Sequence, residues 1–249
     1  MPLSVTIITR NAGAMLEACL KSVSFADEIV VVDSGSTDAT AQIAASHGAR
    51  VVHKNWMGFG PQKQFAVEAA SHDWVLCLDA DERVSEALRE SIIGEMRAPR
   101  GSAYEVARCN LFLGRWLRHG EGYPDWCLRL FDRRRSRWSD DPVHEKVLAA
   151  APALRLSGDL LHQSAETLEN YLDKQNRYTS LQAAAMLAHG RNAGAAQLLL
   201  APLARFIKFY FLRLGFLDGV PGLVHVSIGC MNSFNKYAKL IALQRRARE

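Results

Sequence analysis

Hydrophobic positions in the first hundred residues alternate between two patterns. Short runs rich in β-branched residues, bounded by Gly, Asp, Ser or Asn, predict buried strands over 4–9, 28–33, 50–53 and 74–78. Between these runs apolar residues recur at helical spacing, which predicts helices over 14–23, 39–47, 62–70 and 85–96. A strand followed by a helix, repeated in this way, indicates an α/β fold whose mostly parallel sheet is covered on both faces.

The pattern changes after residue 99. Segments 103–108 and 128–132 predict strands that we expect to add to the sheet in antiparallel orientation. From residue 167 onward the spacing is helical, with breaks expected at Gly190, Gly194, Gly215, Gly219 and Pro221. The hydrophobic pattern therefore predicts an α/β domain followed by a helical extension.

Composition is that of an ordinary folded domain of enzyme size. The chain has 249 residues, of which 49% are hydrophobic and 22% charged, which excludes a disordered, collagen-like or coiled-coil protein. Its five cysteines form no C-x-x-C pair, so a zinc knuckle or a disulfide framework is not expected and a reducing, cytoplasmic setting is favoured. The N-terminus lacks the basic flank and long apolar stretch of a signal peptide, so we do not expect export.

The formal net charge of +4 conceals an asymmetry. Residues 201–249 contain eight basic and two acidic residues, so the rest of the chain is slightly acidic. The apolar segment 198–217 is interrupted by Arg205, Lys208 and Arg213, and 220–231 is short for a membrane span. Aromatic rings interleaved with basic residues favour a helix lying in the interface of an anionic bilayer. The alternative is that the rings pack on the catalytic domain and the charges are solvated.

Acidic residues follow two of the predicted strands, at the edge where α/β sheets bind ligands. Asp79 and Asp81 come directly after the strand 74–78, and two neighbouring carboxylates favour a Mg²⁺ or Mn²⁺ ion that also binds a nucleotide diphosphate. Alternatively, Asp79 caps the next helix and Asp81 is solvated. Asp33 is placed to accept a hydrogen bond from a ribose hydroxyl or a base N–H, or to cap its own turn, and the two roles are compatible.

Three segments together resemble a known family. The segments VTIITRN at 5–11, IVVVDSGSTD at 29–38 and LDADE at 78–82 are similar, in order and spacing, to the nucleotide-sugar half of family 2 inverting glycosyltransferases with the GT-A fold. The resemblance covers about residues 1–100 and implies a Rossmann-like mixed sheet. Segments 126–131, 143–145 and 210–219 resemble the bacterial branch that adds β-glucose to the inner core of lipopolysaccharide.

The resemblance implies a nucleotide-sugar site at the strand ends. In it, the residues 9–11 line the uridine pocket, Asp33 contacts the nucleoside and Lys63 faces the nucleotide. Asp79 holds ribose or sugar hydroxyls, and Asp81 coordinates the metal that bridges the diphosphate. The full implied set is Thr9, Arg10, Asn11, Asp33, Ser36, Lys63, Asp79, Ala80, Asp81 and Arg129.

An inverting transfer also needs a base that takes the proton from the acceptor hydroxyl. A metal stabilises the leaving diphosphate, so the second carboxylic acid of a glycosidase is not required. We assign the base to Glu145, with Asp140 and Asp141 as alternatives. His144 is either a metal or phosphate ligand or a hydrogen-bonded structural residue, and Arg129 either binds phosphate or forms an ordinary ion pair.

These expectations divide the chain into a GT-A catalytic domain over 1–165 and a helical, basic, membrane-associating region over 166–249. Within the domain, 1–100 is the nucleotide-sugar half and 101–165 the acceptor half. The predicted enzyme moves a hexose, glucose from UDP-glucose, onto a lipid-linked saccharide such as the lipopolysaccharide core, and is peripheral on the inner face of the cytoplasmic membrane.

The same residues leave alternatives to this prediction. Polyprenyl phosphate or another surface glycan is the alternative acceptor. A membrane- or nucleic-acid-binding protein is the non-enzyme alternative, but it leaves the strand-end acids unexplained, and acids repel phosphates, so no nucleic-acid partner is expected. A Rossmann dehydrogenase is not expected because no G-x-G-x-x-G follows the first strand.

Overall fold

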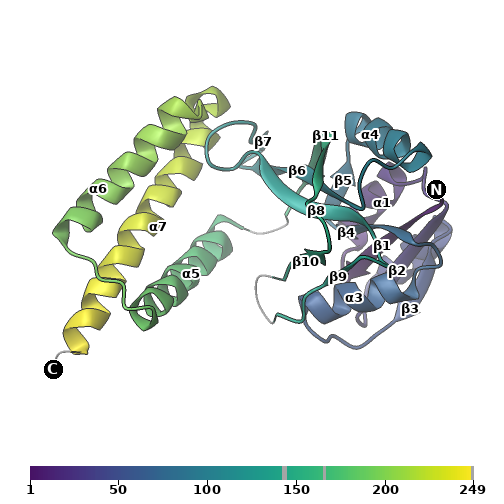
Figure 1. Cartoon of the computed structure of the whole chain (residues 1–249), viewed down its shortest axis with the longest axis horizontal. Coiled ribbons are helices and arrows are strands. Elements are labelled where there is room, and N and C mark those ends of the chain that lie inside the picture. Colours follow the sequence, from purple (N-terminus) through teal and green to yellow (C-terminus); the bar gives the residue numbers. More distant parts are fainter. Residues whose placement is uncertain (142–144, 165–166, 248–249) are drawn as a thin grey trace. The chain divides into compact units, whose positions relative to one another are not determined.

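The computed structural model describes residues 1–141, 145–164 and 167–247. The chain forms two compact units (Figure 1). The sheet unit comprises Met1–Cys109 and Asp125–Gln163, and the helical unit comprises Asn110–Pro124 and Ser164–Glu249. Residues 110–124, which the sequence assigned to the acceptor half, thus belong with the helices. The division of the chain by function stays a prediction.

The sheet unit is built on a mixed sheet with the strand order β3-β2-β1-β4-β8-β6-β11-β5. Neighbours are parallel from β3 to β4, β8 is antiparallel to both β4 and β6, and β5 is antiparallel to β11. The predicted strands and their antiparallel additions are confirmed, whereas β5 and β11 were not foreseen. The strands are β1 (Leu3–Thr9), β2 (Glu28–Asp33), β3 (Arg50–His53), β4 (Trp74–Asp79), β5 (Glu82–Val84), β6 (Ala103–Phe112), β8 (Asp125–Asp132) and β11 (Leu154–His162).

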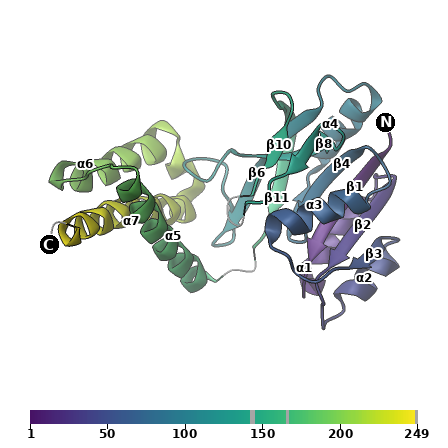
Figure 2. The ribbon, with the colours of Figure 1, turned by 60° about the horizontal axis from the view of Figure 1, so that its bottom comes forward.

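Helices cover both faces of this sheet, as the hydrophobic pattern predicts (Figure 2). One face packs Val5 and Ile7 of β1 against Leu16 of α1 and Leu88 of α4, and all four side chains are buried. The other face packs Ile8 of β1 with α3. The helices are α1 (Gly13–Ser22), α2 (Thr40–Ser46), α3 (Phe59–Ala69) and α4 (Glu86–Arg97).

Three short strands complete the extended elements within the described residues. β7 (Arg115–Trp116) pairs with the end of β6 in the helical unit. β9 (Ser136–Trp138) and β10 (Val147–Ala149) pair with each other in antiparallel orientation. In this pair Trp138 lies opposite Val147.

The helical unit consists of α5 (Leu168–Ala188), α6 (Ala195–Phe206), a π-helical turn η1 (Ile207–Leu212), a 3-10 turn η2 (Gly215–Asp218) and α7 (Gly219–Arg246). Both α5 and α6 pack along α7. The expected break at Pro221 is wrong, because α7 begins at Gly219 and a proline in the first helical turn needs no amide donor. A Cβ on Gly222 would lie 2.3 Å from the Gly215 carbonyl oxygen. The close approach of η2 and α7 therefore requires a residue without a side chain at position 222.

Candidate functional site

The loops that follow β1 and β2 hold each other by hydrogen bonds. Asp33 Oδ2 accepts from the amides of Gly35 at 3.1 Å and Ser36 at 3.0 Å, and the Ser36 hydroxyl donates to Asp33 Oδ1. Ser36 Oγ in turn accepts from the Asn11 amide at 2.8 Å, while Asn11 Oδ1 accepts from the Thr37 amide at 2.8 Å. Asp33 therefore has the turn-capping role, and its contact with a nucleoside stays a prediction.

Two buried polar groups near these loops lack protein partners. The Thr9 hydroxyl, on a residue that is 6% exposed, has no hydrogen-bond partner within the described residues. The same holds for Gln62 Oε1, although Gln62 Nε2 donates to Ser34 Oγ at 3.0 Å and to the Lys54 carbonyl at 3.2 Å. Buried polar atoms without partners are rare in native proteins. Gln62 was not predicted as a site residue because it belongs to no recognisable motif. The predicted site residue Arg10 is exposed beside this region.

Four of the predicted residues meet at the end of β4. Lys63, from α3, places Nζ 3.2 Å from Asp79 Oδ1 and 3.2 Å from Glu145 Oε1. Arg129, from β8, places Nη2 3.1 Å from Asp79 Oδ2. The side chains of Lys63 and Arg129 are 7% and 5% exposed. The structure thus brings together Asp79, two buried cations and Glu145, the carboxylate that the sequence analysis assigned as base.

The electrostatics of Asp79 follow from these neighbours. Burial alone would raise the pKa of Asp79, but the charges of Arg129 and Lys63 outweigh it and hold this pKa well below its usual range. Asp79 does not cap a helix, because α4 begins at Glu86 and is capped by Ser85, whose Oγ accepts from the Leu88 amide at 3.3 Å. Asp79 is therefore a fixed anion at the site.

Glu82 supports this arrangement and was not foreseen as a site residue. It is fully buried; its Oε1 lies 2.6 Å from Arg129 Nη2 and its Oε2 accepts from the Asp79 amide at 3.0 Å. Burial and the nearby charge of Asp79 raise the pKa of Glu82, opposed by Arg129. The sequence carried its signal, since Glu82 immediately follows the D-x-D pair. Arg129 is thus the counter-ion of two acids, and its contact with phosphate stays a prediction.

Asp81 faces a histidine that sequence analysis also missed. Asp81 Oδ2 lies 3.3 Å from His162 Nε2, and the Asp81 carbonyl accepts from the Gln163 amide at 3.0 Å. His162 is the last residue of β11, in which alternation of apolar residues is confined to the leucines at 154 and 156 before Gly158 and Asp159 interrupt it. Ala80, between the two aspartates, is buried in the core.

The donor set at Asp81 fits a divalent first-row metal, for which carboxylate oxygen and imidazole nitrogen are suitable ligands. Within the described residues no three His, Cys, Asp or Glu side chains gather into a metal-binding group. A metal bound by Asp81 and His162 would therefore take its other ligands from diphosphate oxygens and water, as Mg²⁺ commonly does. His144, the predicted ligand, lies outside the described residues.

Close packing places Glu145 beside Lys63. A Cβ on Gly60 of α3 would lie 2.3 Å from the Ser139 carbonyl oxygen and 3.4 Å from Glu145 Cβ. The alternative base Asp140 is 74% exposed and pairs with Arg137 at 3.7 Å, and Asp141 is also exposed. Glu145 is therefore the carboxylate of this loop that contacts the buried cluster.

Trp138, the last residue of β9, packs its ring against Lys63. Lys63 Nζ lies 4.9 Å from the centroid of the Trp138 ring, within the range of a cation–π contact. The Trp138 indole N–H donates to Cys77 Sγ at 3.4 Å, and the ring is buried. The lysine is thus oriented by an aromatic face as well as by two carboxylates.

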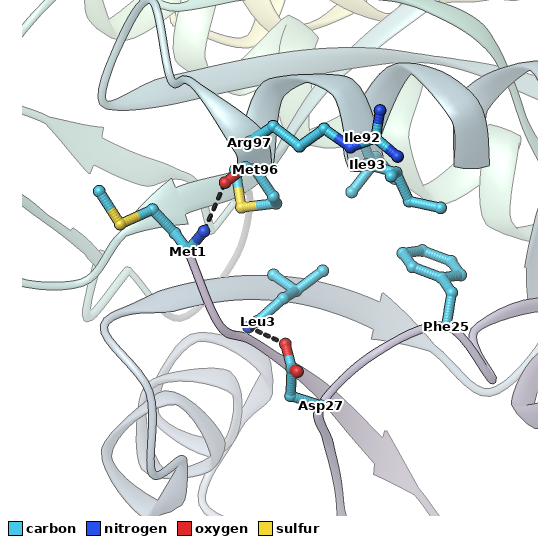
Figure 3. A pocket seen from close by; sticks show the side chains of 8 residues that line it. All are labelled: Met1, Leu3, Phe25, Asp27, Ile92, Ile93, Met96 and Arg97. Atoms are coloured by element: carbon cyan, nitrogen blue, oxygen red, sulfur yellow. Dashed lines mark hydrogen bonds between the residues drawn. The ribbon is translucent and has the colours of Figure 1, made fainter.

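A surface hollow lies elsewhere on the sheet unit (Figure 3). It surrounds the start of β1, where the Leu3 amide donates to Asp27 Oδ2 at 2.8 Å. Its lining is mainly apolar and includes none of the predicted site residues: Met1, Leu3, Phe25, Asp27, Ile92, Ile93, Met96 and Arg97. Since the site residues follow the carboxyl ends of the strands, this hollow is not the candidate site.

In nucleotide-binding α/β folds the ligand lies at the carboxyl ends of the strands, and here a carboxylate and two buried cations meet at the end of β4. Residues 4–155 match the model of the family described as Glycosyl transferase family 2, so the chain belongs to this family. Its sheet with a C-terminal helical region is the predicted GT-A arrangement, and the chain is a nucleotide-sugar-dependent glycosyltransferase.

Two named relatives are similar over nearly the whole chain, and one solved structure is similar over part of it. The lipopolysaccharide core biosynthesis glycosyltransferase LpsC of Rhizobium meliloti is 31% identical, over 96% of this chain and 92% of that protein. A glycosyltransferase of Rickettsia typhi is 30% identical, over 99% of this chain and 89% of that protein. Glucosyl-3-phosphoglycerate synthase from Mycobacterium tuberculosis, solved with Mn²⁺, UDP and glucosyl-3-phosphoglycerate, is 28% identical over 42% of this chain and 43% of that chain, with a TM-score of 0.37.

Proposed function

We propose that this glycosyltransferase moves glucose from UDP-glucose, with inversion, onto a hydroxyl of a lipid-linked saccharide such as the lipopolysaccharide core. The observation that carries the proposal is the contact of Lys63 with both Asp79 and Glu145 at the end of β4. Support for the acceptor class comes from LpsC, whose name specifies lipopolysaccharide core biosynthesis and which is similar over 96% of this chain.

The donor is held by the strand-end residues in this proposal. Residues 9–11 and Asp33 bind the uridine, Lys63 lies toward the diphosphate, and Asp79 accepts hydrogen bonds from ribose or sugar hydroxyls. Asp81 and His162 would hold Mg²⁺ or Mn²⁺, which supplies positive charge to the diphosphate as it leaves. The Thr9 hydroxyl and Gln62 Oε1, which are buried without hydrogen-bond partners among the described residues, would form hydrogen bonds with the nucleoside once donor binding exposes them.

Glu145 acts as the base. The acceptor hydroxyl gives its proton to Glu145 while its oxygen forms a bond to the anomeric carbon, and the bond from that carbon to the diphosphate breaks with the electron pair leaving on UDP. Lys63, hydrogen-bonded to Glu145 Oε1, orients the carboxylate. One displacement of this kind inverts the anomeric centre.

Attachment to the membrane is the third part of the proposal. A lipid-linked acceptor is presented at a bilayer surface, and the helical unit carries the basic and aromatic residues of the C-terminal region. The enzyme is then peripheral on the inner face of the cytoplasmic membrane, with an anionic membrane surface as its partner.

The test is a comparison of Glu145→Gln with Asp140→Asn, using UDP-glucose, Mn²⁺ and a lipid-linked saccharide. We expect transfer by the Glu145 variant to fall about 10²–10⁴-fold while its affinity for UDP is kept, and the exposed Asp140 variant to match the wild type. Wild-type transfer by Glu145→Gln would reject this base. A screen of other nucleotide sugars and of polyprenyl phosphate, an acceptor that needs no base, tests the donor and acceptor.

A further inference from the structure

The outer side of α6, η1 and η2 is apolar and exposed. Leu199 is 66% exposed, Leu203 55%, Phe211 52% and Leu212 74%. The sequence from 195 to 217 contains no Asp or Glu. By length and composition alone, Ala195–Leu212 passes as a candidate membrane span, and none of that stretch is buried. Exposed apolar patches of this kind mark a surface that meets a partner or a membrane.

The inner side of α6 belongs to the helical unit. Arg205 Nε lies 3.0 Å from Glu121 Oε2, and a second guanidinium contact joins the same pair. Gly229 of α7 lies directly against this pair, since a Cβ there would lie 2.3 Å from Glu121 Oε2. A spanning α6 would carry this ion pair and the adjacent Lys208 into hydrocarbon, where charges are costly. A helix lying in the interface keeps the pair against α7 and places only the apolar side in lipid.

Basic side chains border the exposed apolar side, and their charge is little compensated. Lys208 Nζ lies over the Phe209 ring at 5.1 Å, and Arg213 Nη2 donates to the Tyr123 carbonyl at 3.1 Å; neither has a carboxylate partner in the described parts of the chain. Arg115 Nη2 donates to the Leu217 carbonyl at 2.9 Å, and its ion-pair partner, the buried Asp218, is at 3.9 Å.

The end of α7 is basic but lacks the apolar component. Lys239 Nζ is occupied by α5, donating to the Asn176 carbonyl at 2.7 Å and to Thr179 Oγ1 at 2.8 Å. Arg245 and Arg246 are exposed, but among the described residues no large hydrophobic side chain beyond Phe234 is exposed. Because interfacial binding needs buried apolar area as well as charge, the two basic regions are not equivalent.

We propose that the membrane contact is confined to a lipid-facing edge, formed by the exposed apolar side chains of α6, η1 and η2 together with Arg115, Lys208 and Arg213. The apolar side chains enter the interface of an anionic bilayer, and the three cations bind lipid phosphates. The inference rests on the peripheral attachment of the proposed function and assigns it to this edge instead of the basic end of α7.

The test measures sedimentation of the full chain with vesicles of phosphatidylcholine alone or mixed with phosphatidylglycerol, without donor or acceptor. The double variant Lys208→Gln with Arg213→Gln is compared with Arg245→Gln with Arg246→Gln, which removes the same charge. We expect the first to lose about 30-fold in affinity for anionic vesicles, and the second less than 3-fold. Equal losses would overturn the assignment.

A second pair of variants tests the apolar component. Phe211→Ser with Leu212→Ser should reduce binding about 10-fold or more, whereas Leu172→Ser with Leu181→Ser, at exposed positions of α5, should not. Unchanged binding by the first pair overturns the proposal.

The same edge could instead be covered by a second copy of this chain, and light scattering without lipid tests this. A dimer that becomes monomeric on the Phe211 and Leu212 changes also overturns the proposal. Unfolding midpoints equal to that of the wild type verify that the variants fold. Asp81→Asn should bind vesicles as the wild type does. An error in the proposed donor site would therefore show only in a UDP titration and not in vesicle binding.

Discussion

Lys63 and Glu145 are hydrogen-bonded at 3.2 Å although 82 positions separate them in the sequence. Lys63 also contacts Asp79, so a single buried ammonium links the carboxylate proposed to bind the donor to the proposed base. Donor binding and proton transfer are therefore expected to depend on the same side chain.

Replacing Lys63 tests this link. Lys63→Met keeps most of the side-chain volume but removes the charge, and a charge-assisted hydrogen bond is worth about 1.5–3 kcal/mol. We expect kcat/KM for the donor to fall about 10–100-fold, measured by steady-state transfer, with an additional decrease in kcat if Glu145 loses its orientation. Lys54→Met, at a partly exposed lysine over the Phe65 ring, is the control and should stay within 2-fold.

The pair formed by Glu82 and Arg129 should matter for stability. Glu82→Gln leaves a buried guanidinium with one fewer counter-ion, and breaking a buried ion pair costs about 3–5 kcal/mol in free energy of unfolding. Urea denaturation measures this change. Glu86→Gln, which removes an exposed i,i+3 partner of Arg89, should cost less than about 0.5 kcal/mol, and similar losses for both variants would contradict the prediction.

The absence of a side chain at Gly60 lets α3 pack closely against Ser139 and Glu145. Gly60→Ala places a Cβ 2.3 Å from the Ser139 carbonyl oxygen, which forces Ser139 to move. We expect a loss of about 1–3 kcal/mol in stability together with reduced transfer. Gly94→Ala in α4, where a Cβ meets nothing within 4 Å, should be neutral or slightly stabilising.

We expect the protein to lose stability in acid as Glu28 becomes protonated. Burial raises the pKa of Glu28, but hydrogen bonds from Ser4, Arg50 and Ser71 outweigh it and lower the pKa from 4.5 to about 2. Because the folded pKa lies below the unfolded one, the stabilisation is complete above about pH 5 and is lost as the pH falls from 4.5 through 2. After allowance for solvent screening it amounts to about 2 kcal/mol.

The matching measurement is urea denaturation of the wild type and Glu28→Gln between pH 3 and pH 7. The difference in unfolding free energy should be largest at neutral pH and shrink on acidification. A difference that is independent of pH would show that Glu28 stabilises the fold by packing and not by its charge.

The periodicity of the sequence predicted the parallel strands, the covering helices and the helical C-terminal region, because each depends on local spacing of apolar residues. It did not predict β5 or β11, because Gly158 and Asp159 interrupt the apolar alternation in β11 and β5 covers only Glu82–Val84. His162 was missed with its strand.

The residues of the candidate site also differ in whether the sequence alone could predict them. Residues in motifs at strand ends, such as Asp33, Asp79 and Asp81, could be named from the sequence, and their roles stay predictions. The partnership of Glu82 with Arg129, and the approach of Glu145 to Lys63, depend on contacts across 47 and 82 positions. Such contacts arise from the fold and have no local signature.

The hydrogen bonds between Asn11 and the residues 36 and 37 have a consequence for engineering. Since each loop supplies a donor and an acceptor to the other, replacing one of them alone would leave unmatched polar groups at the edge of the proposed uridine pocket. Enzymes with altered nucleotide preference are therefore best built by exchanging the two loops together as one cassette.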